Sequence, residues 1–281
     1  MTIADLHIHS KYSDGSDSIE DLAKKIKLAG IKYFALTDHD TIEGCELMES
    51  VIDKEIKFIP SIELTCIVDS IKCHILGYNC DYKNSILLNL IKKGKILRKN
   101  KLETRIHYLK ETWDINLTQE ELDWLYSRKS VVKTHLANIL VKRNLAPDNI
   151  SAMKKYLDGC KSGDTRFTGE EAINAILSSG GIPIWAHPLG GEGEVHITKE
   201  DFLNKLETMK CYGIKGIECY YSRYNLEEIE FLTKIAKEQN LLITGGSDYH
   251  GKNKDIPLSK LNTDNIPVEK DNLTLLKICN L

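Results

Sequence analysis

Two histidines lie one residue apart in the segment Asp5-Leu6-His7-Ile8-His9, and Asp14 follows shortly afterwards. Imidazole nitrogens and carboxylate oxygens are common ligands of zinc, manganese and iron. Residues 3–8 alternate in part between apolar and polar, which predicts a short strand. Because residues i and i+2 of a strand point to the same face, His7 and His9 can hold one ion without distorting the backbone. The remaining ligands must come from elsewhere in the chain.

The same kinds of side chain recur at later strand-like segments. We predict strands at 33–37, 57–64, 71–78, 182–186, 214–219 and 241–246. Most of them contain or precede a candidate ligand, namely His39, Glu63, His74, His187, Asp248 and His250. In a (β/α) barrel the carboxyl ends of the strands meet on one face, so we expect these side chains to converge there. A carboxylate such as Glu63 can bridge two ions, and clustered ions activate water and bind both oxygens of a phosphoester during displacement.

Helical patterns separate these strands. We predict helices at 18–30, 44–52, 168–179, 199–212 and 226–238. The order strand, helix, strand predicts parallel pairing and an α/β fold. Residues 85–161 break this order, because helical stretches at 86–113, 118–127 and 132–143 follow one another without strands. We therefore predict a barrel domain formed by 1–84 and 162–281, with a helical insertion or cap over 85–161.

The composition limits the substrates and the cellular location that this chemistry could have. The 281 residues are 42% hydrophobic and carry a formal net charge of -3, so strong nonspecific binding to nucleic acid is not indicated. A nucleotide substrate remains compatible, because bound metal ions can outweigh the net charge locally. The start of the chain lacks the pattern of a secretory signal, and no uncharged stretch is long enough to span a bilayer. We expect a cytoplasmic protein with reduced cysteines, no membrane association and no obligate protein partner.

Several motifs follow in order from the N-terminus almost to the C-terminus: Asp5-Leu6-His7-Ile8-His9, Ser13-Asp14-Gly15, Thr37-Asp38-His39-Asp40, Glu63, Cys73-His74, Ala186-His187-Pro188 and Gly246-Ser247-Asp248-Tyr249-His250-Gly251. With these motifs the chain resembles the polymerase-and-histidinol-phosphatase (PHP) family of metal-dependent phosphoesterases. The resemblance implies a distorted seven-stranded TIM-like (β/α) barrel that holds two or three divalent ions of manganese, zinc or iron. Its implied ligand groups are His7, His9, Glu63 and Asp248; Glu63, His74 and His187; and Asp14, His39 and His250. Asp38 neighbours His39 but points to the opposite strand face, so we expect it to orient a histidine.

The helical insertion suggests a substrate class. The chain resembles the stand-alone phosphoesterases of the family that act on phosphates of nucleotides or short oligonucleotides. Their insertion carries an Arg-x-His element, which here reads Lys133-Thr134-His135. Lys133 keeps the positive charge but loses bidentate phosphate recognition. Arg223, in a segment that lacks the histidine expected there, is a further candidate for phosphate binding.

These features predict a hydrolase that cleaves a phosphomonoester or terminal phosphodiester with metal-activated water. Two alternatives remain open at this stage. One is histidinol-phosphate phosphatase, which uses the same chemistry on an amino-alcohol phosphate. The other is a non-catalytic metal-binding or polymerase-associated module. Lys133, His135 and Arg223 also have plainer interpretations, as solvated charges or as a histidine packed within a helix.

Overall fold

The computed structural model describes residues 3–127, 131, 133–161, 166–192 and 194–279. These residues form two compact units, one of residues 1–91 and 167–281 and the other of residues 92–166. The insertion was predicted over 85–161. Its first helix, α3 (Ser85–Trp113), begins within the first unit and continues into the second. The predicted boundary at residue 162 lies outside the described residues.

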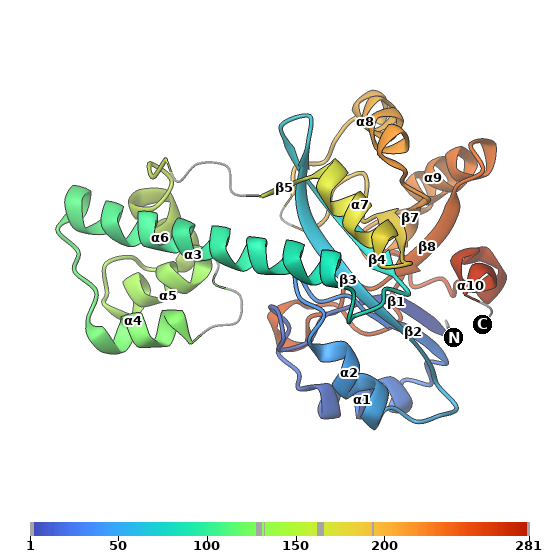
Figure 1. The fold of residues 1–281 in the computed structure, drawn as a ribbon, viewed down its shortest axis with the longest axis horizontal. Coiled ribbons are helices and arrows are strands. Elements are labelled where there is room, and N and C mark those ends of the chain that lie inside the picture. Colours follow the sequence, from blue (N-terminus) through green and yellow to red (C-terminus); the bar gives the residue numbers. More distant parts are fainter. Residues whose placement is uncertain (1–2, 128–130, 132, 162–165, 193, 280–281) are drawn as a thin grey trace. The chain divides into compact units, whose positions relative to one another are not determined.

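A single sheet forms the centre of the first unit (Figure 1). Its strands follow the order β1 (Ala4–Ile8), β2 (Tyr33–Leu36), β3 (Lys57–Val68), β4 (Ile71–Tyr78), β6 (Ile182–Trp185), β7 (Gly216–Tyr221) and β8 (Leu242–Gly246), and β5 (Phe167–Thr168) pairs with β3. Backbone hydrogen bonds connect the two ends of this sheet, β1 and the segment after β8. The N–H of Asp248 donates to the carbonyl of His7 at 2.9 Å. The N–H of His9 donates to Tyr249, also at 2.9 Å. The sheet is therefore a nearly closed barrel, which confirms the predicted fold class.

The strand β4 departs from the parallel pattern that a regular (β/α) barrel would have. It pairs antiparallel with both β3 and β6, whereas the other pairs in the sheet are parallel. A two-residue turn at Asp69 and Ser70, with φ of 48° and 64°, joins β3 directly to β4. Positive φ at both central residues is the geometry that two-residue hairpins require. The expectation that every strand meets the site with its carboxyl end is therefore wrong for β4, where His74 lies in the first half of the strand.

Helices cover the outside of the barrel. Figure 1 shows α1 (Ile19–Leu28) and α2 (Gly44–Val51) beside β1 and β2, and α9 (Leu226–Glu238) beside β7 and β8. The helix α7 (Gly169–Ser178) contacts β3, β4 and β6, and α8 (Lys199–Tyr212) contacts α7 and β3. Thr168 and Glu171 form a capping box at the start of α7. Apolar faces of these helices are buried against the strands; the ring of Phe202 in α8 stacks on Trp185 in β6 with centroids 5.3 Å apart. The chain ends with η1 (Gly251–Asn253), η2 (Lys270–Asn272) and α10 (Leu275–Ile278).

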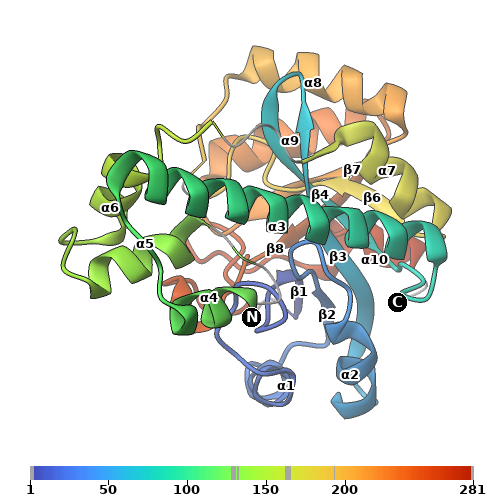
Figure 2. The same ribbon diagram turned by 60° about the vertical axis from the view of Figure 1, so that its left-hand side comes forward.

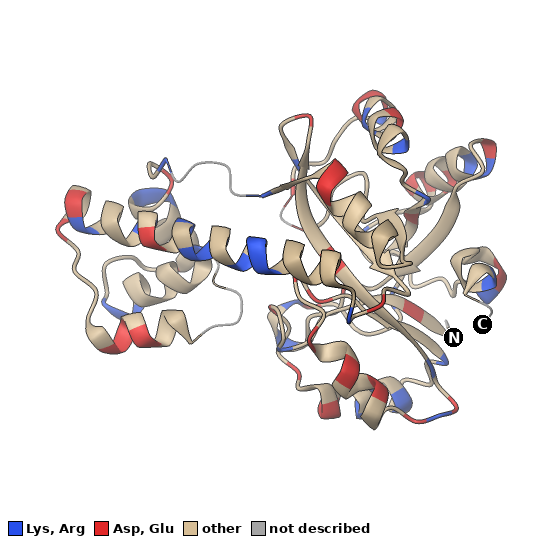
Figure 3. Ribbon diagram, in the orientation of Figure 1, with Lys and Arg blue, Asp and Glu red and all other residues tan. Residues whose placement is uncertain are grey.

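The described secondary structure of the second unit is helical. Figure 2 shows α4 (Gln119–Tyr126), α5 (Lys133–Lys142) and α6 (Asn149–Tyr156) grouped with the later part of α3. Leu109, Leu125 and Leu140 are among the buried side chains of its separate core. The sequence did not reveal α6, which is capped by Asp148. Figure 3 shows basic positions along α3, a helix whose sequence is rich in lysine. Within the described residues, no helix is both long and apolar enough to cross a membrane.

Candidate metal centre

The predicted ligands from distant parts of the chain meet at one edge of the barrel. Their nitrogen and oxygen atoms form overlapping groups in which all ligand atoms lie within 4.8 Å of one another. The groups are His9, Asp14, His39 and His250; His7, His9 and Glu63; His39, Glu63 and His74; and His74, His187 and Glu194. Glu63 lies in two of these groups and is 1% exposed. The structure thus brings together side chains that the sequence separates by as many as 243 positions, from His7 to His250.

His7 and His9 face one oxygen of Glu63. Glu63 Oε2 lies 3.3 Å from His7 Nε2 and 3.2 Å from His9 Nε2. Asp248 Oδ1 lies 3.6 Å and 3.3 Å from the same two nitrogens. The other nitrogen of His7, Nδ1, donates to Glu218 Oε1 at 2.9 Å. That hydrogen bond leaves Nε2 free to face the carboxylates, which is the usual arrangement of a metal-binding histidine.

His74 and His187 face the other oxygen of Glu63. Glu63 Oε1 lies 3.0 Å from His74 Nδ1 and 3.3 Å from His187 Nε2, and these two nitrogens are 3.2 Å apart. The remaining nitrogen of His187, Nδ1, lies 3.2 Å from Glu194 Oε2. The two oxygens of Glu63 therefore face different sets of histidines, as a bridging carboxylate would.

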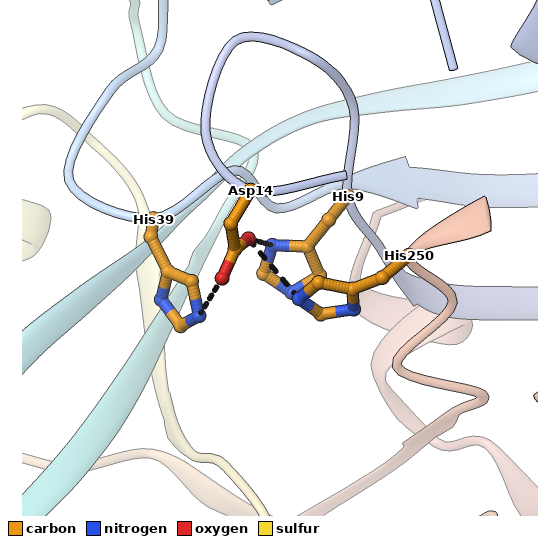
Figure 4. A group of neighbouring side chains, drawn as sticks. All are labelled: His9, Asp14, His39 and His250. Carbon is orange, nitrogen blue, oxygen red and sulfur yellow. Dashed lines mark ion pairs between the residues drawn. The ribbon is translucent and has the colours of Figure 1, made fainter. Parts of the chain in front are cut away.

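Asp14 lies at the centre of a further group of ligand atoms. Figure 4 shows the side chains of His9, His39 and His250 pointing toward it. Asp14 Oδ1 lies 3.1 Å from His250 Nε2, and Asp14 Oδ2 lies 3.8 Å from His39 Nε2. The loop that carries Asp14 is fixed by Asp38, which accepts hydrogen bonds from the N–H and hydroxyl of Ser10 and from the hydroxyl of Ser13. We expected Asp38 to orient a histidine; its described partners are serines because it faces the turn after β1.

The donor set fits divalent transition-metal ions. Several ring nitrogens and a carboxylate oxygen in the cluster are buried and make no hydrogen bond among the described residues: His7 Nε2, His9 Nε2, His39 Nδ1, Glu63 Oε2 and His250 Nε2. Buried polar atoms normally have a partner, so such a concentration of unsatisfied atoms at one point requires an explanation. Bound ions would satisfy them, since imidazole and carboxylate are ligands of zinc, manganese and iron.

The charges in the cluster also favour ion binding. Burial alone would raise the pKa of Glu63, but His39, His74 and His7 hold this pKa well below its usual range. Burial lowers the pKa of His39 well below its usual value, although Glu63 and Asp14 oppose this effect. Ionised carboxylates and neutral imidazoles are the forms that bind metal ions. The pKa of His7 is raised, because Glu218 and Glu63 outweigh the opposite effect of burial, so an ion bound there would displace a proton.

A pocket of about 180 Å³ opens over the cluster. Besides the candidate ligands, Lys72, Lys254 and Glu192 line it. Lys254 Nζ donates to Asp248 Oδ2 at 2.7 Å, which leaves Oδ1 facing the histidines. Arg223 Nη2 donates to Glu192 Oε1 at 2.6 Å, so this predicted phosphate contact is connected to the pocket through an acidic residue.

The other two predicted substrate contacts lie in the second unit. Lys133 forms an ion pair with Asp158. The ring of His135 lies edge-on to Trp124 with centroids 5.6 Å apart. Their role in substrate binding stays a prediction.

The sequence reasoning missed several residues of the site, among them Glu194, Glu218, Lys72 and Lys254. Glu218 had a visible signal, because it is a charged residue within the apolar strand segment Gly216-Ile217-Glu218-Cys219. It is fully buried and, besides His7, accepts a hydrogen bond from the backbone N–H of His187 at 2.8 Å. Lys72 precedes His74 by two positions and so shares its strand face. Nothing in the sequence distinguishes Glu194 or Lys254 from other surface charges.

Comparison with known proteins identifies a family and relatives along most of the chain. The model of the PHP domain family matches residues 5–164. A 5′-3′ exoribonuclease of Haemophilus influenzae is 30% identical over 265 residues, which cover 90% of this chain and 94% of that protein. A phosphoribosyl 1,2-cyclic phosphate 1,2-diphosphodiesterase of Eggerthella lenta is 26% identical, over 91% of this chain and 97% of that protein. The crystal structure of a predicted metal-dependent phosphoesterase from Bifidobacterium adolescentis matches with a TM-score of 0.76 at 22% identity, covering 95% of this chain and 97% of that one. This last likeness establishes the fold.

Proposed function

Since the chain is a phosphoesterase of the PHP domain family, we propose that it hydrolyses a phosphomonoester or terminal phosphodiester of a nucleotide or short oligonucleotide. The observation that carries the proposal is the convergence of histidines and carboxylates on both oxygens of the buried Glu63. Relatives named for cleavage of RNA and of a cyclic sugar phosphate support the substrate class. No feature of the described residues favours histidinol phosphate or a non-catalytic module.

The side chains of the cluster would hold two or three divalent ions of manganese, zinc or iron. Such ions lower the pKa of water and neutralise phosphoryl oxygens when they are bound. His7, His9, Glu63 and Asp248 would hold one ion, and Glu63, His74 and His187 a second. Asp14, His39 and His250 would complete a third position.

Other side chains orient this set. Glu218 fixes the ring of His7, and Lys254 fixes the carboxylate of Asp248. Lys72 and Lys254 line the pocket above the cluster, where their charges face the space that a substrate phosphate enters. Charged donors form the stronger class of hydrogen bonds to phosphate, so these two lysines are suited to position it.

The test is a screen of phosphorylated metabolites and short oligonucleotides against the manganese-loaded protein. We expect release of phosphate or of a terminal nucleotide from nucleotide or oligonucleotide substrates, and much slower release from histidinol phosphate. Asp248→Asn, with unchanged circular dichroism, should abolish the activity. Preferred turnover of histidinol phosphate would refute the substrate class, and full activity of Asp248→Asn would refute the site.

A further inference from the structure

A second pocket lies beside the metal centre and shares a wall with it. Its volume is about 380 Å³, and it is formed by the start of β4, the end of β6, the segments 188–190 and 194–197, and one residue of α8. Lys72, His74, His187 and Glu194 line both this pocket and the smaller one over the cluster. A group bound in the larger pocket would therefore lie next to a phosphate held at the metal centre.

The residue of α8 in this pocket is Lys205, which is only 4% exposed. Its Nζ donates to the carbonyl of Val68 at 3.1 Å, and this is its one hydrogen bond or ion pair among the described residues. An ammonium group has three N–H donors. Lysine is almost never buried without a charged partner, because an uncompensated charge away from water is strongly unfavourable. The described part of the protein supplies no such partner.

The nearby carboxylates are engaged elsewhere. Glu194 lies 3.0 Å from Lys72 Nζ and 3.2 Å from His187 Nδ1. Asp69 accepts a hydrogen bond from Thr208 at 3.3 Å. The pocket thus contains a basic side chain that forms no ion pair with a carboxylate of the described residues.

The pocket wall around Lys205 is largely apolar. Trp185, Ile71 and Ile197 line it, and the thiol of Cys73 contributes a further weakly polar surface. Burial raises the pKa of the Cys73 thiol to about 11, and the nearby positive charge of Lys205 opposes this rise. Charge-assisted hydrogen bonds are stronger where apolar walls exclude water. A small oxyanion would find a charged donor here in a setting of low polarity.

We propose that Lys205 anchors a phosphate subsite in this pocket, next to the metal centre. Its phosphate is either a second phosphate group of the substrate or free orthophosphate. The existence of the subsite does not depend on the proposed function; only the assignment to a substrate's second phosphate rests on it. The wall shared through His74 and His187 favours a substrate whose two phosphates occupy the two pockets together.

The first experiment is a calorimetric titration of chelator-treated, metal-free protein with inorganic phosphate. The parent protein should bind phosphate, and Lys205→Met, which keeps an apolar stem of similar length, should bind at least tenfold more weakly. Lys210→Met is the matched control, because Lys210 lies on the same helix but pairs with Glu207 at the surface. The phosphate affinity of this variant should equal that of the parent. Equal affinity of Lys205→Met and the parent, or no binding to the folded parent, would overturn the proposal.

A second variant tests the same subsite without touching the buried lysine. Ile71 is 43% exposed at the pocket, so Ile71→Glu adds a carboxylate there without disturbing the core. Its repulsion should weaken phosphate binding at least severalfold. An unchanged affinity would count against this location.

The source of the phosphate is decided with manganese-loaded protein. The Michaelis constants of Lys205→Met and the parent are compared for a 3′,5′-nucleoside bisphosphate and for an aryl monophosphate. If Lys205→Met raises the Michaelis constant for the bisphosphate by a factor at least ten times larger than for the monophosphate, the occupant is a second phosphate of the substrate. Equal changes for both substrates, with orthophosphate binding still lost, identify free orthophosphate. A parent protein that hydrolyses neither compound, nor any nucleotide or short oligonucleotide in the screen, would refute the proposed function, while the titration would still decide the subsite.

Discussion

Replacing Glu218 with glutamine should weaken metal binding although Glu218 is not itself in the ligand groups. Its two carboxylate oxygens accept from His7 Nδ1 at 2.9 Å and from the backbone N–H of His187 at 2.8 Å. An amide has a single acceptor oxygen, so Glu218→Gln can satisfy one of these donors and must turn its NH₂ group toward the other. His187 has a φ of 29°, a strained value for a residue with a side chain, so the backbone hydrogen bond helps to hold it.

The size of the effect follows from the kind of hydrogen bond that is lost. A hydrogen bond to a charged group contributes about 1.5–3 kcal/mol, and about 1.4 kcal/mol corresponds to a factor of ten in an equilibrium constant. We therefore expect metal affinity to fall by roughly 10–100-fold, in line with other changes behind metal-binding histidines.

The assay is a competition titration of the metal-loaded protein with a chelator of known affinity. Glu207→Gln serves as the control, because Glu207 is exposed on α8 and pairs only with Lys210 among the described residues. Metal affinity of Glu218→Gln equal to that of the parent would refute the reasoning, provided that circular dichroism shows the same fold.

Three further predictions concern catalysis, pH and substrate binding. His7→Ala should remove hydrolysis of an aryl phosphate and lower metal content while circular dichroism stays unchanged; retained turnover would contradict its assignment as a ligand. Hydrogen bonds from Lys25 and Tyr249 hold the pKa of Asp17 below its value in the unfolded chain, although burial opposes this. The ionised Asp17 therefore stabilises the fold above about pH 4, and this contribution is lost as the pH falls through the pKa of the folded state. The melting temperature of Asp17→Asn should therefore lie below that of the parent at pH 7, and the gap should narrow in acid; a gap independent of pH would count against the ion pair. Lys133→Ala should raise the Michaelis constant for a nucleotide more than it changes metal content, and unchanged kinetics would leave Lys133 with only its structural partner, Asp158.

The sequence predicted the barrel and the members of the cluster because both depend on local patterns. Strand-like segments that end in His, Asp or Glu were visible one by one, and the barrel topology explains why they meet. The direction of β4 was not visible, since an isolated strand pattern does not reveal its pairing partner. The positive φ of Asp69 and Ser70 is what turns the chain back, and Asp and Ser are compatible with many other loops.

The residues behind the ligands were harder to predict. Glu218 and Glu194 act on His7 and His187 through contacts between segments far apart in the sequence, and their spacing follows no motif. Lys205 gave no signal either, because a lysine in a helix is usually exposed. Its burial depends on how α8 packs against the β3–β4 hairpin, through the hydrogen bond to Val68.

The central proposal is that Glu63 would be a ligand at two of the metal positions, one shared with His7 and His9 and the other with His74 and His187. Elemental analysis of untagged protein after loading with manganese, zinc or iron tests it most directly, with Glu63→Gln measured in parallel. We predict two or three ions per chain in the parent and the loss of at least one ion in Glu63→Gln. A parent protein that retains no ion after loading, or a variant with the full metal content of the parent, would contradict the claim.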